Sequence, residues 1–311
     1  MVKVFIDGSA GTTGLRIHDR LLKRDDVFLI TLDESQRKDQ SARKTAIENA
    51  DIVFLCLPDE AAKESVMLAQ NTDTIIIDAS TAHRVNPDWT YGLLELGDDI
   101  YSSVKTSKRI CVPGCHASGF ISLVRPLMEN SVLSKDYPFS CTSLTGYSGG
   151  GKSMIKSYQD INRNASLSVP NIYALTQTHK HLKEMKQYSG TSQYPVFSPI
   201  ITDVYSMMCV TVNISLKGTG KNIDDIRNIY IDKYKNRPLI ITSDIEALEY
   251  EGFIPCDSWK NKDSMKICVT GNDERVSLIA LYDNLGKGAS GAAIQIFNTI
   301  TGCEETKGLQ V

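Results

Sequence analysis

A cysteine that follows a turn and precedes a helix is the first candidate for chemistry in this sequence. The segment 111–119 reads Cys-Val-Pro-Gly-Cys-His-Ala-Ser-Gly, and its Pro-Gly step is a turn signal. Apolar residues recur at helical spacing from Ala117 to Met128, which predicts a helix that begins beside Cys115. The N–H groups and dipole of a helix N-terminus favour a thiolate and lower its pKa from roughly 8.5. Cys115 is therefore a candidate nucleophile, although a reduced cysteine can also be a small buried apolar residue.

Two of the five histidines, His179 and His181, lie one residue apart. Glu184 follows His181 at i+3, so the two side chains would share a helical face. A carboxylate in that position would orient the imidazole and raise its pKa, as an acid–base histidine needs. Metal binding is a competing interpretation, but no further His or Cys cluster has ligand spacing. A solvated helix start is the other alternative.

Two further stretches are candidates for binding an anion of the substrate. The segment 146–152 has three consecutive glycines and lacks the P-loop spacing, yet Ser148, Gly149 and Lys152 suit a phosphate or oxyanion nest. Arg84 follows an expected strand, where its guanidinium would contact a phosphate or carboxylate. The alternatives are a flexible loop for the glycines and a surface ion pair for Arg84.

A glycine-rich turn near the N-terminus indicates a dinucleotide. Residues 2–6 form an apolar strand pattern, and residues 15–22 have helical character. Glycines between a strand and a helix allow a tight turn and let a pyrophosphate approach the helix N-terminus. The spacing here is GxxGxxG rather than the more common GxGxxG. The predicted cofactor contacts are Gly8, Ser9, Ala10, Gly11, Thr12, Thr13 and Gly14.

The residues after the second expected strand bear on the choice between NAD and NADP. Asp33 or Glu34 could accept a hydrogen bond from a ribose 2′-OH, as in NAD sites. Ser35, Arg37 and Lys38 could instead hold the 2′-phosphate of NADP. A solvated loop is the third interpretation, and the sequence pattern alone leaves the choice open.

The order of the elements in the first third predicts a parallel, doubly wound sheet. Strand patterns alternate with helical segments, and the run at residues 52–57 is apolar almost throughout, as a strand buried on both faces requires. Ligands bind such sheets at the carboxyl ends of the strands, where Pro58 and Ser80 are further candidate contacts. The expected strands are 2–6, 27–32, 52–57 and 74–78, and helical character is expected over 46–50 and after Pro58.

The rest of the chain predicts a second, α+β domain with a mixed or antiparallel sheet. Residues 207–216 alternate in polarity, and residues 223–234 form an amphipathic helix. Further strands are expected at 140–145, 239–241, 267–270 and 276–282. A glycine-rich loop then opens a last helix, which should return to the first domain and bring Asn284, Gly286, Lys287 and Gly288 to the cofactor. The predicted domains are 1–115, completed by 285–311, and 116–284.

Composition limits the classes of partner. The chain has 311 residues, of which 41% are apolar and 23% charged, and its net charge is −3. A charge of this size gives no electrostatic case for nucleic acid or an anionic membrane. No apolar run approaches the ~20 residues needed to cross a bilayer, and the N-terminus has no signal-peptide pattern. The eight cysteines lack CxxC spacing, so we expect reduced thiols in a cytoplasmic protein and a small-molecule substrate.

Several motifs, in order along the whole chain, resemble the N-acetyl-gamma-glutamyl-phosphate reductase family, in its shorter second type. The Pro-Gly-Cys and Asp-Asn-Leu-Gly-Lys-Gly elements are the most specific. One departure is Lys183, which stands where the family often has proline in His-x-His-x-Pro-Glu. The matching motifs are Gly8-Ser-Ala-Gly-Thr-Thr-Gly14, Cys-Val-Pro-Gly-Cys115-His-Ala-Ser-Gly, Ser148-Gly-Gly-Gly-Lys152, His179-Lys-His181 and Asp283-Asn-Leu-Gly-Lys-Gly-Ala-Ser-Gly-Ala-Ala.

The resemblance implies an NADP(H)-dependent step of arginine biosynthesis, with N-acetyl-L-glutamyl 5-phosphate reduced to the 5-semialdehyde. It also implies that Cys115 forms a thioester and suggests His181 as its acid–base partner. The alternative is a related enzyme of the aspartate-semialdehyde dehydrogenase type, with the same chemistry on another acyl phosphate. A homodimer or homotetramer is expected.

Overall fold

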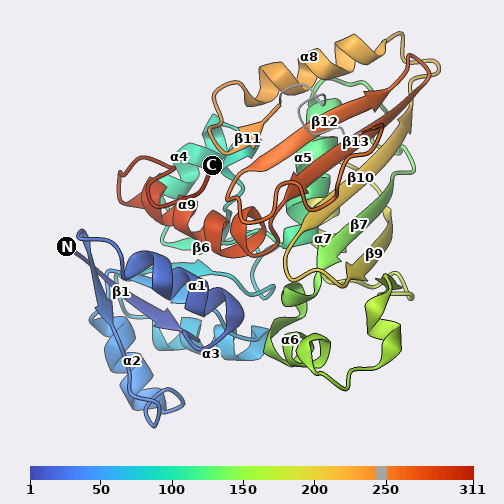
Figure 1. Ribbon diagram of the computed structural model, residues 1–311. Coiled ribbons are helices and arrows are strands. Elements are labelled where there is room, and N and C mark those ends of the chain that lie inside the picture. The colour runs from blue at the N-terminus through green and yellow to red at the C-terminus, as the bar shows by residue number, and fades with distance from the viewer. Residues whose placement is uncertain (243–250) are drawn as a thin grey trace. The chain divides into compact units, whose positions relative to one another are not determined.

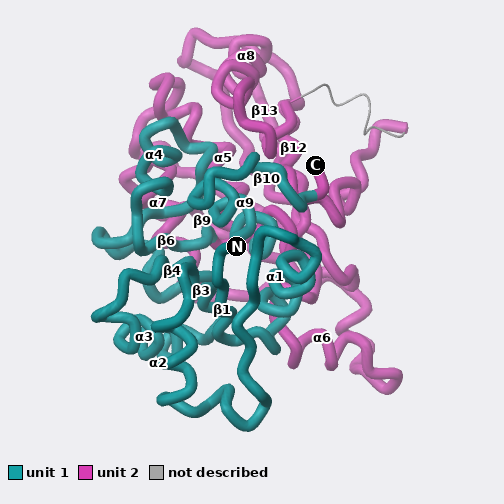
Figure 2. The backbone as a smooth tube through the Cα atoms, turned by 90° about the vertical axis from the view of Figure 1, so that its left-hand side faces the viewer, with its two compact units in different colours: residues 1–113, 289–309 teal, residues 114–288, 310–311 magenta. Residues whose placement is uncertain are grey.

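The computed structural model describes residues 1–242 and 251–311, which form two compact units. Unit 1 comprises residues 1–113 and 289–309, and unit 2 comprises residues 114–288 and 310–311. Figure 1 labels the elements and Figure 2 colours the two units. The chain passes from unit 1 to unit 2 between Pro113 and Gly114.

Unit 1 is a six-stranded parallel sheet in the order β2-β1-β3-β4-β6-β5. From β1 the strands extend to both sides, with β2 on one side and β3 on the other. This is the doubly wound arrangement, in which ligands bind at the carboxyl edge of the sheet. The fold predicted for the first third is therefore confirmed, and β5 and β6 extend the sheet. The strands are β1 (Val2–Asp7), β2 (Val27–Ile30), β3 (Ile52–Leu55), β4 (Ile75–Asp78), β5 (Thr90–Tyr91) and β6 (Arg109–Cys111).

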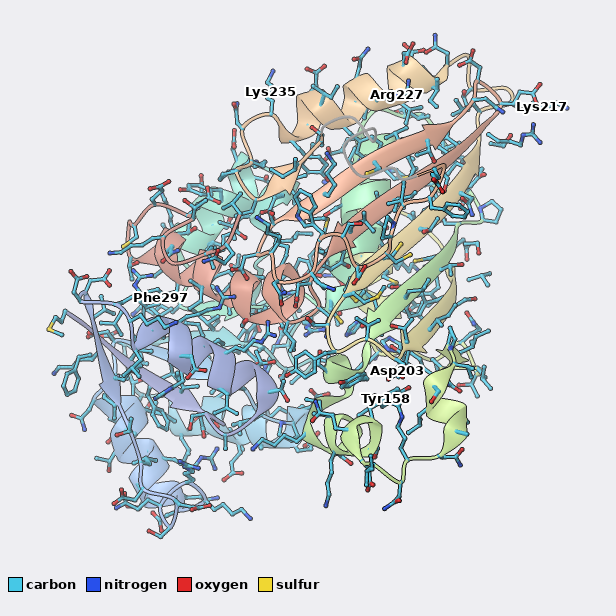
Figure 3. All side chains as sticks on the ribbon, in the orientation of Figure 1. Tyr158, Asp203, Lys217, Arg227, Lys235 and Phe297 are labelled. Carbon is cyan, nitrogen blue, oxygen red and sulfur yellow. The ribbon has the colours of Figure 1, made fainter. Side chains whose placement is uncertain are left out.

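Helices cover both faces of this sheet, and the strand alternation shows which helix lies on which face. Val4 and Ile6 of β1 pack in the cluster that holds residues of α1, α4 and α9. Phe5, between them, packs in the other cluster, with residues of α2 and α3. Phe297 lies on α9 (Figure 3), and its ring centroid is 5.9 Å from that of Phe54. The helices are α1 (Thr12–Leu21), α2 (Gln40–Glu48), α3 (Asp59–Leu68), α4 (Asp98–Thr106) and α9 (Gly291–Ile300).

A buried ion pair fixes the end of β1, immediately before the glycine turn. The Arg43 guanidinium of α2 donates to Asp7 at 3.0 and 3.2 Å. The Ser65 hydroxyl of α3 donates to the same carboxylate oxygen at 2.7 Å. All three side chains are buried, and a buried charge is tolerated only with such partners. This network ties α2 and α3 to the strand that presents the turn.

Unit 2 is a seven-stranded mixed sheet in the order β11-β12-β13-β10-β7-β9-β8, with helices α5, α7 and α8 packed on it or on one another. Its β7–β9 and β11–β12 pairs are parallel and the others antiparallel, which confirms the predicted mixed sheet. The strands are β7 (Ser140–Gly146), β8 (Asn171–Ile172), β9 (Val196–Thr202), β10 (Met208–Ser215), β11 (Ile240–Ile241), β12 (Met265–Gly271) and β13 (Arg275–Tyr282). The helices are α5 (Cys115–Glu129), α6 (Gly151–Gln159), α7 (Leu182–Ser189) and α8 (Ile223–Tyr234).

Helix α5 packs tightly on the sheet of unit 2. A Cβ on Gly119 would lie 2.6 Å from both Tyr282 and Val210, so glycine is required where α5 approaches β10 and β13. The hydroxyls of Tyr230 and Tyr234, both on α8, donate hydrogen bonds to backbone carbonyls of α5. The position of α5 is therefore set by three elements, β10, β13 and α8. No helix in the described part of the chain has the length and apolarity to cross a membrane.

Candidate active site

Cys115 is the first residue of α5, as the sequence predicts, and its side chain is half-buried. Gly114 is the N-cap in an extended conformation. The Tyr282 hydroxyl donates to the Cys115 carbonyl and accepts from the Gly119 N–H at 3.1 Å, so it bridges the first turn. This turn therefore presents Cys115 with the positive end of a 15-residue helix behind it.

The loop after β13 brings Gly288 against the cysteine. A Cβ on Gly288 would lie 3.0 Å from the Cβ of Cys115. The Asp283 carboxylate accepts from Leu285 and Gly286 N–H groups and from the Ser206 hydroxyl, which fixes the loop. Small residues at this position let the backbone approach Cys115 closely.

The same loop carries four predicted cofactor contacts, Asn284, Gly286, Lys287 and Gly288. Of these, Asn284 and Lys287 are buried in unit 2. The Asn284 side chain accepts from the Met207 N–H at 3.0 Å and donates to the Ser148 hydroxyl at 3.0 Å. Asn284 thus connects the loop to the glycine cluster at residues 149–151. No motif in the sequence predicts this link.

Glu184 lies between the cysteine turn and the histidine pair. Its carboxylate accepts from the Gly114 N–H at 3.0 Å, and its other oxygen is 3.9 Å from His181 Nε2. Glu184 and His181 are both buried. Glu184 thus lies close to His181 and also bonds to the backbone amide of the residue that directly precedes Cys115.

His179 has a defined tautomer. The His181 backbone N–H donates to His179 Nδ1 at 3.1 Å, so a neutral His179 carries its proton on Nε2. The ring centroids of the two histidines are 4.7 Å apart. Among the residues described, no group of three or more His, Cys, Asp or Glu side chains is arranged as metal ligands would be.

The loop that carries these histidines is anchored to β9. The Gln177 side chain donates to the Phe197 carbonyl and accepts from the Phe197 N–H, both at 2.8 Å. Ala174 and Gln177 have positive φ angles of 52° and 57°. Non-glycine residues in this region cost about 1–3 kcal/mol each and persist only when their surroundings hold them. The loop therefore has a defined shape between Tyr173 and His179.

His116 and Tyr173 complete the site, and sequence reasoning did not identify either. His116 Nδ1 is 2.7 Å from the Ser143 hydroxyl, and His116 Nε2 is 2.7 Å from the Tyr173 hydroxyl. The His116 ring centroid is 5.5 Å from those of both His179 and His181. The position of His116 directly after Cys115 was the one signal available in the sequence.

The glycine cluster has more regular structure than a loop. Residues Tyr147–Gly150 form a 3-10 helix, and α6 begins at Gly151, whose φ is +75°. Tyr147 and Tyr158 stack at 4.7 Å, and Asp203 accepts from the Arg163 guanidinium, which itself donates to the Tyr158 carbonyl (Figure 3). This packing fixes where the cluster lies in unit 2.

The three residues predicted to bind substrate in this cluster differ in exposure. Ser148 is buried and Gly149 is exposed. Lys152, in the first turn of α6, is also exposed. The structure therefore separates a buried hydroxyl, Ser148, from an exposed ammonium group, Lys152.

The glycine turn in unit 1 has the geometry of a phosphate-binding turn. Gly8 has φ +88°, and a Cβ there would lie 2.3 Å from the Cys56 carbonyl oxygen. A Cβ on Gly14 would lie 2.4 Å from the Gly8 carbonyl oxygen. Thr12 Oγ1 is buried and has no hydrogen-bond partner among the described residues. A glycine cradle with an unsatisfied hydroxyl at a helix N-terminus fits a pyrophosphate.

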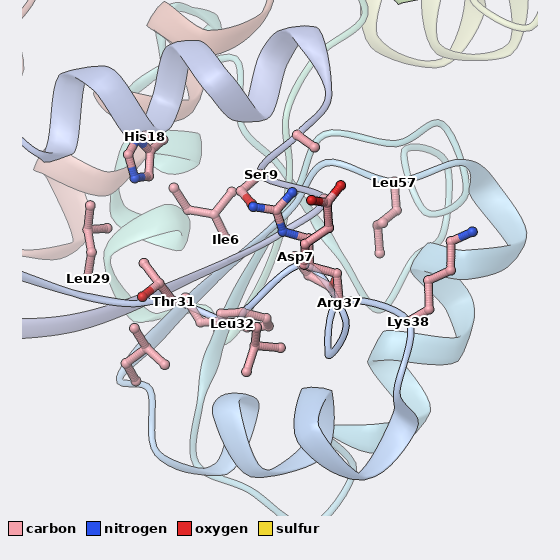
Figure 4. A pocket seen from close by; sticks show the side chains of 15 residues that line it. Ile6, Asp7, Ser9, His18, Leu29, Thr31, Leu32, Arg37, Lys38 and Leu57 are labelled. Atoms are coloured by element: carbon pink, nitrogen blue, oxygen red, sulfur yellow. The ribbon is translucent and has the colours of Figure 1, made fainter.

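A cavity of about 370 Å³ opens beside this turn (Figure 4). Gly8, Ser9 and Ala10 line one part of it, and Glu34, Arg37 and Lys38 line another. The structure thus brings the predicted pyrophosphate turn and the predicted 2′-phosphate residues to one cavity within unit 1. Its lining includes both candidate cations and Glu34, one of the two carboxylates that the sequence offered for a ribose.

The other predicted ligand contacts of unit 1 have structural partners at the carboxyl edge of the sheet. The Asp78 carboxylate accepts from the Ser80 N–H and hydroxyl, both at 2.8 Å, and lies 2.7 Å from His83 Nδ1. Arg84 is buried, and its guanidinium donates to the Ala79 carbonyl at 3.2 Å. Pro58 is the N-cap residue of α3.

Two family models match the chain. The one described as semialdehyde dehydrogenase, NAD binding domain, matches residues 3–102, and the one described as semialdehyde dehydrogenase, dimerisation domain, matches residues 115–284. Aspartate semialdehyde dehydrogenase II from Vibrio cholerae, complexed with ASA, has a TM-score of 0.72 at 16% identity, over 97% of this chain and 98% of its own. The enzyme from Candida albicans, with NADP, has a TM-score of 0.63 at 16% identity and the same coverage. The fold class is that of the semialdehyde dehydrogenases.

Curated relatives define the family more narrowly. N-acetyl-gamma-glutamyl-phosphate reductase of Brucella anthropi is 39% identical over 306 residues, which is 96% of this chain and 98% of that protein. The reductase of Sinorhizobium medicae is 38% identical over 299 residues, 94% of this chain and 96% of that protein. The chain belongs to the N-acetyl-gamma-glutamyl-phosphate reductase family, which confirms the resemblance found in its motifs.

Proposed function

We propose that this protein reduces N-acetyl-L-glutamyl 5-phosphate to N-acetyl-L-glutamate 5-semialdehyde with NADPH, as a step of arginine biosynthesis. The observation that carries the proposal is the geometry around Cys115: a half-exposed cysteine begins a helix, and Glu184 bonds to the preceding amide and lies 3.9 Å from His181. The names of the relatives from Brucella anthropi and Sinorhizobium medicae support the choice of substrate.

Cys115 is the proposed nucleophile. Its thiolate attacks the acyl carbon, a C–S bond forms, the bond to the phosphate oxygen breaks, and inorganic phosphate leaves. His181 donates the proton that the leaving phosphate takes up, and Glu184 orients the imidazole and stabilises its charged form. Amides of the first turn of α5 stabilise the oxyanion at the acyl carbon, a contribution of roughly 3 kcal/mol per donor in other enzymes.

The cofactor would lie on the glycine turn of unit 1. Gly8 to Gly14 would hold the pyrophosphate, and Arg37 and Lys38 would hold the 2′-phosphate. Bound NADPH supplies the hydride that reduces the acyl carbon of the thioester. The C–S bond then breaks, the aldehyde leaves, and the thiolate of Cys115 is restored.

The substrate anions need cationic or hydrogen-bonding partners. We assign this role to Arg84 in unit 1 and to Ser148, Gly149 and Lys152 in unit 2. The remaining cofactor contacts that we propose are Pro58, Ser80, Asn284, Gly286, Lys287 and Gly288. His179 supports His181 through the bond between its Nδ1 and the His181 N–H.

The assembly that we propose is a homodimer or homotetramer in the cytoplasm. The family model that matches residues 115–284 is described as a dimerisation domain. Leu144, Thr211 and Ile279 are only partly buried, on strands β7, β10 and β13. A sheet face of this kind suits an interface between copies. All eight cysteines in the described chain are thiols rather than disulfides, which suits a reducing compartment.

A spectrophotometric assay in the reverse direction tests the activity. The purified protein should form NADPH from NADP when N-acetyl-glutamate semialdehyde and phosphate are both present. Aspartate semialdehyde, in the same assay, is the comparison substrate. Faster NADPH formation with aspartate semialdehyde would replace the proposal with the aspartate-semialdehyde type of reaction, and no NADPH with either aldehyde would refute both.

A further inference from the structure

The backbone of Gln310 is hydrogen-bonded to Asp263 in both directions. The Asp263 N–H donates to the Gln310 carbonyl at 2.6 Å, and the Gln310 N–H donates to the Asp263 carboxylate at 2.8 Å. Asp263 is fully buried, and a buried carboxylate is tolerated only where hydrogen-bond donors reach it. Residues 289–309 belong to unit 1, whereas Gln310 and Asp263 both belong to unit 2. The chain thus returns to unit 2 at a buried acidic side chain.

The segment that carries Asp263 packs directly on the loop after β13. The Asn261 N–H donates to the Asp283 carboxylate at 2.8 Å. A Cβ on Gly286 would lie 2.3 Å from the Lys262 carbonyl oxygen and 3.1 Å from a carboxylate oxygen of Asp263. The two segments are therefore in contact at both ends of the turn that Asp283 begins, with no space for a side chain between them.

The opposite side of the same loop lies against the proposed nucleophile. A Cβ on Gly288 would lie 3.0 Å from the Cβ of Cys115. The Gly288 N–H donates to the Asp283 carbonyl at 3.0 Å, which closes the loop on itself. A closed loop moves as one piece, so its contact with Asp263 on one side determines how closely Gly288 approaches Cys115 on the other.

We propose that Asp263 is a positioning residue that, paired with the backbone of Gln310, holds the loop after β13 against Cys115. The residue acts through the loop, whose Gly288 limits the space on one side of the Cys115 side chain. A reaction on the sulfur needs a defined space, because the acyl group must be oriented for attack by hydride. The inference deepens the proposed function, on which it rests for the role of Cys115.

Gln310→Pro tests the proposal, because proline has no N–H to donate to Asp263. Gln310→Ala is the matched control, since it keeps the N–H and the Gln310 side chain is exposed. The rate of alkylation of Cys115 by iodoacetamide is measured by mass spectrometry, at a pH where the rate no longer rises and therefore reports access to the thiolate. A loosened loop should make alkylation about threefold faster or more in Gln310→Pro only. Equal rates in both variants and the wild type would overturn the proposal.

A double-mutant cycle tests whether the effect passes through the Asp263 carboxylate. Asp263→Ala should speed alkylation at least as much as Gln310→Pro, and adding the second change to the first should have no further effect, because both remove one bond. Additive changes would overturn the assignment. If Gln310→Pro does not fold, Asp263→Asn replaces it, since its amide oxygen can still accept from Gln310. Alkylation should then be slower in Asp263→Asn than in Asp263→Ala, and equal rates would contradict the proposal.

Turnover and thermal unfolding separate a positioning role from a purely structural one. Gln310→Pro should turn over substrate more slowly than Gln310→Ala by about threefold or more, at a temperature well below the unfolding transition of either variant. A lower Tm with unchanged alkylation and unchanged turnover would show a structural role only and overturn the proposal. Alkylation needs neither substrate nor cofactor, so an inactive wild-type protein would refute the proposed function without affecting the alkylation result.

Discussion

The glycine turn of unit 1 and the cysteine turn of unit 2 both present a helix N-terminus, but they are built differently. The turn of unit 1 depends on its backbone: Gly8 has a left-handed conformation against Cys56, and the cavity beside it is lined by residues between Phe5 and Leu57. The turn of unit 2 depends on side chains from distant positions, with Glu184 on Gly114 and Tyr282 on Cys115. A turn whose shape depends on its backbone can be specified by residues close together in the sequence. A site that makes and breaks bonds needs polar side chains that several helices and strands hold in place.

The largest expected effect is at the cysteine. Cys115→Ser replaces the thiolate with a hydroxyl that stays protonated at neutral pH, so turnover should fall by about 10³-fold or more. NADPH binding should be unchanged, because the glycine turn belongs to unit 1. A steady-state assay measures turnover, and a fluorescence titration measures NADPH binding. A serine variant that keeps activity, or one that loses cofactor binding, would contradict the division of roles between the two turns.

Gly8→Ala tests the backbone character of the other turn. Its Cβ would lie 2.3 Å from a carbonyl oxygen at a φ of +88°, so NADPH affinity should fall by about tenfold or more and the protein should lose stability. Gly308→Ala is the matched control, since Gly308 also has a positive φ of 75° but open space around its Cβ position. Titration and thermal unfolding compare the two variants. Equal losses in both would show that strain, rather than the fit of the turn, explains the effect.

Arg37→Ala should change cofactor preference by about tenfold, through the loss of a charge-assisted bond to the 2′-phosphate. The expected change is weaker NADPH binding with NADH binding retained, measured as the ratio of the two Kd values. Arg227→Ala, on the exposed α8 of unit 2, is the control (Figure 3). An unchanged ratio would remove Arg37 from the 2′-phosphate site.

Another expected effect concerns acid stability and His116. Between pH 6.5 and about 3 the unfolded chain binds a proton at this position and the folded chain does not, because folding lowers the pKa of His116. The free energy of unfolding should therefore fall with decreasing pH, by at most about 1.4 kcal/mol per pH unit from this group. His116→Gln removes this titrating group. The free energy of unfolding of the variant, measured by urea unfolding, should therefore fall less between pH 6 and pH 4 than that of the wild type. Parallel curves for the two proteins would contradict the burial of a neutral His116.

The sequence predicts most of unit 1 because its determinants are local. The strand-turn-helix pattern, the buried run at 52–57 and the glycine turn each depend on residues within one short segment. The predicted strands of this unit agree with the observed ones within two residues, whereas the helix predicted at 46–50 begins earlier, at Gln40. Strand β9 was not predicted, because Pro199 interrupts its pattern and its pairing with β7 depends on residues 56 positions away. The parallel register of that pair has no local signal.

The cysteine site was predicted only in part. Cys115, His181 and Glu184 could be chosen because residue type and helical spacing carry the signal. Ser143 and Tyr173 could not, because they contact His116 across 27 and 57 residues and neither belongs to a motif. Tyr282 reaches the Cys115 carbonyl across 167 residues. Such contacts follow from the order of strands in the seven-stranded sheet, and the spacing of residues along the chain does not reveal that order.

If Cys115 carries the acyl group during turnover, that group can be trapped on its sulfur. The protein is mixed with N-acetyl-L-glutamyl 5-phosphate in the absence of NADPH, quenched in acid and digested. The mass of the peptide that contains Cys115 is then measured by mass spectrometry. One N-acetylglutamyl group should be found on Cys115, and later addition of NADPH should remove it. An unmodified Cys115 in a preparation that turns over the same substrate with NADPH would contradict this role of Cys115.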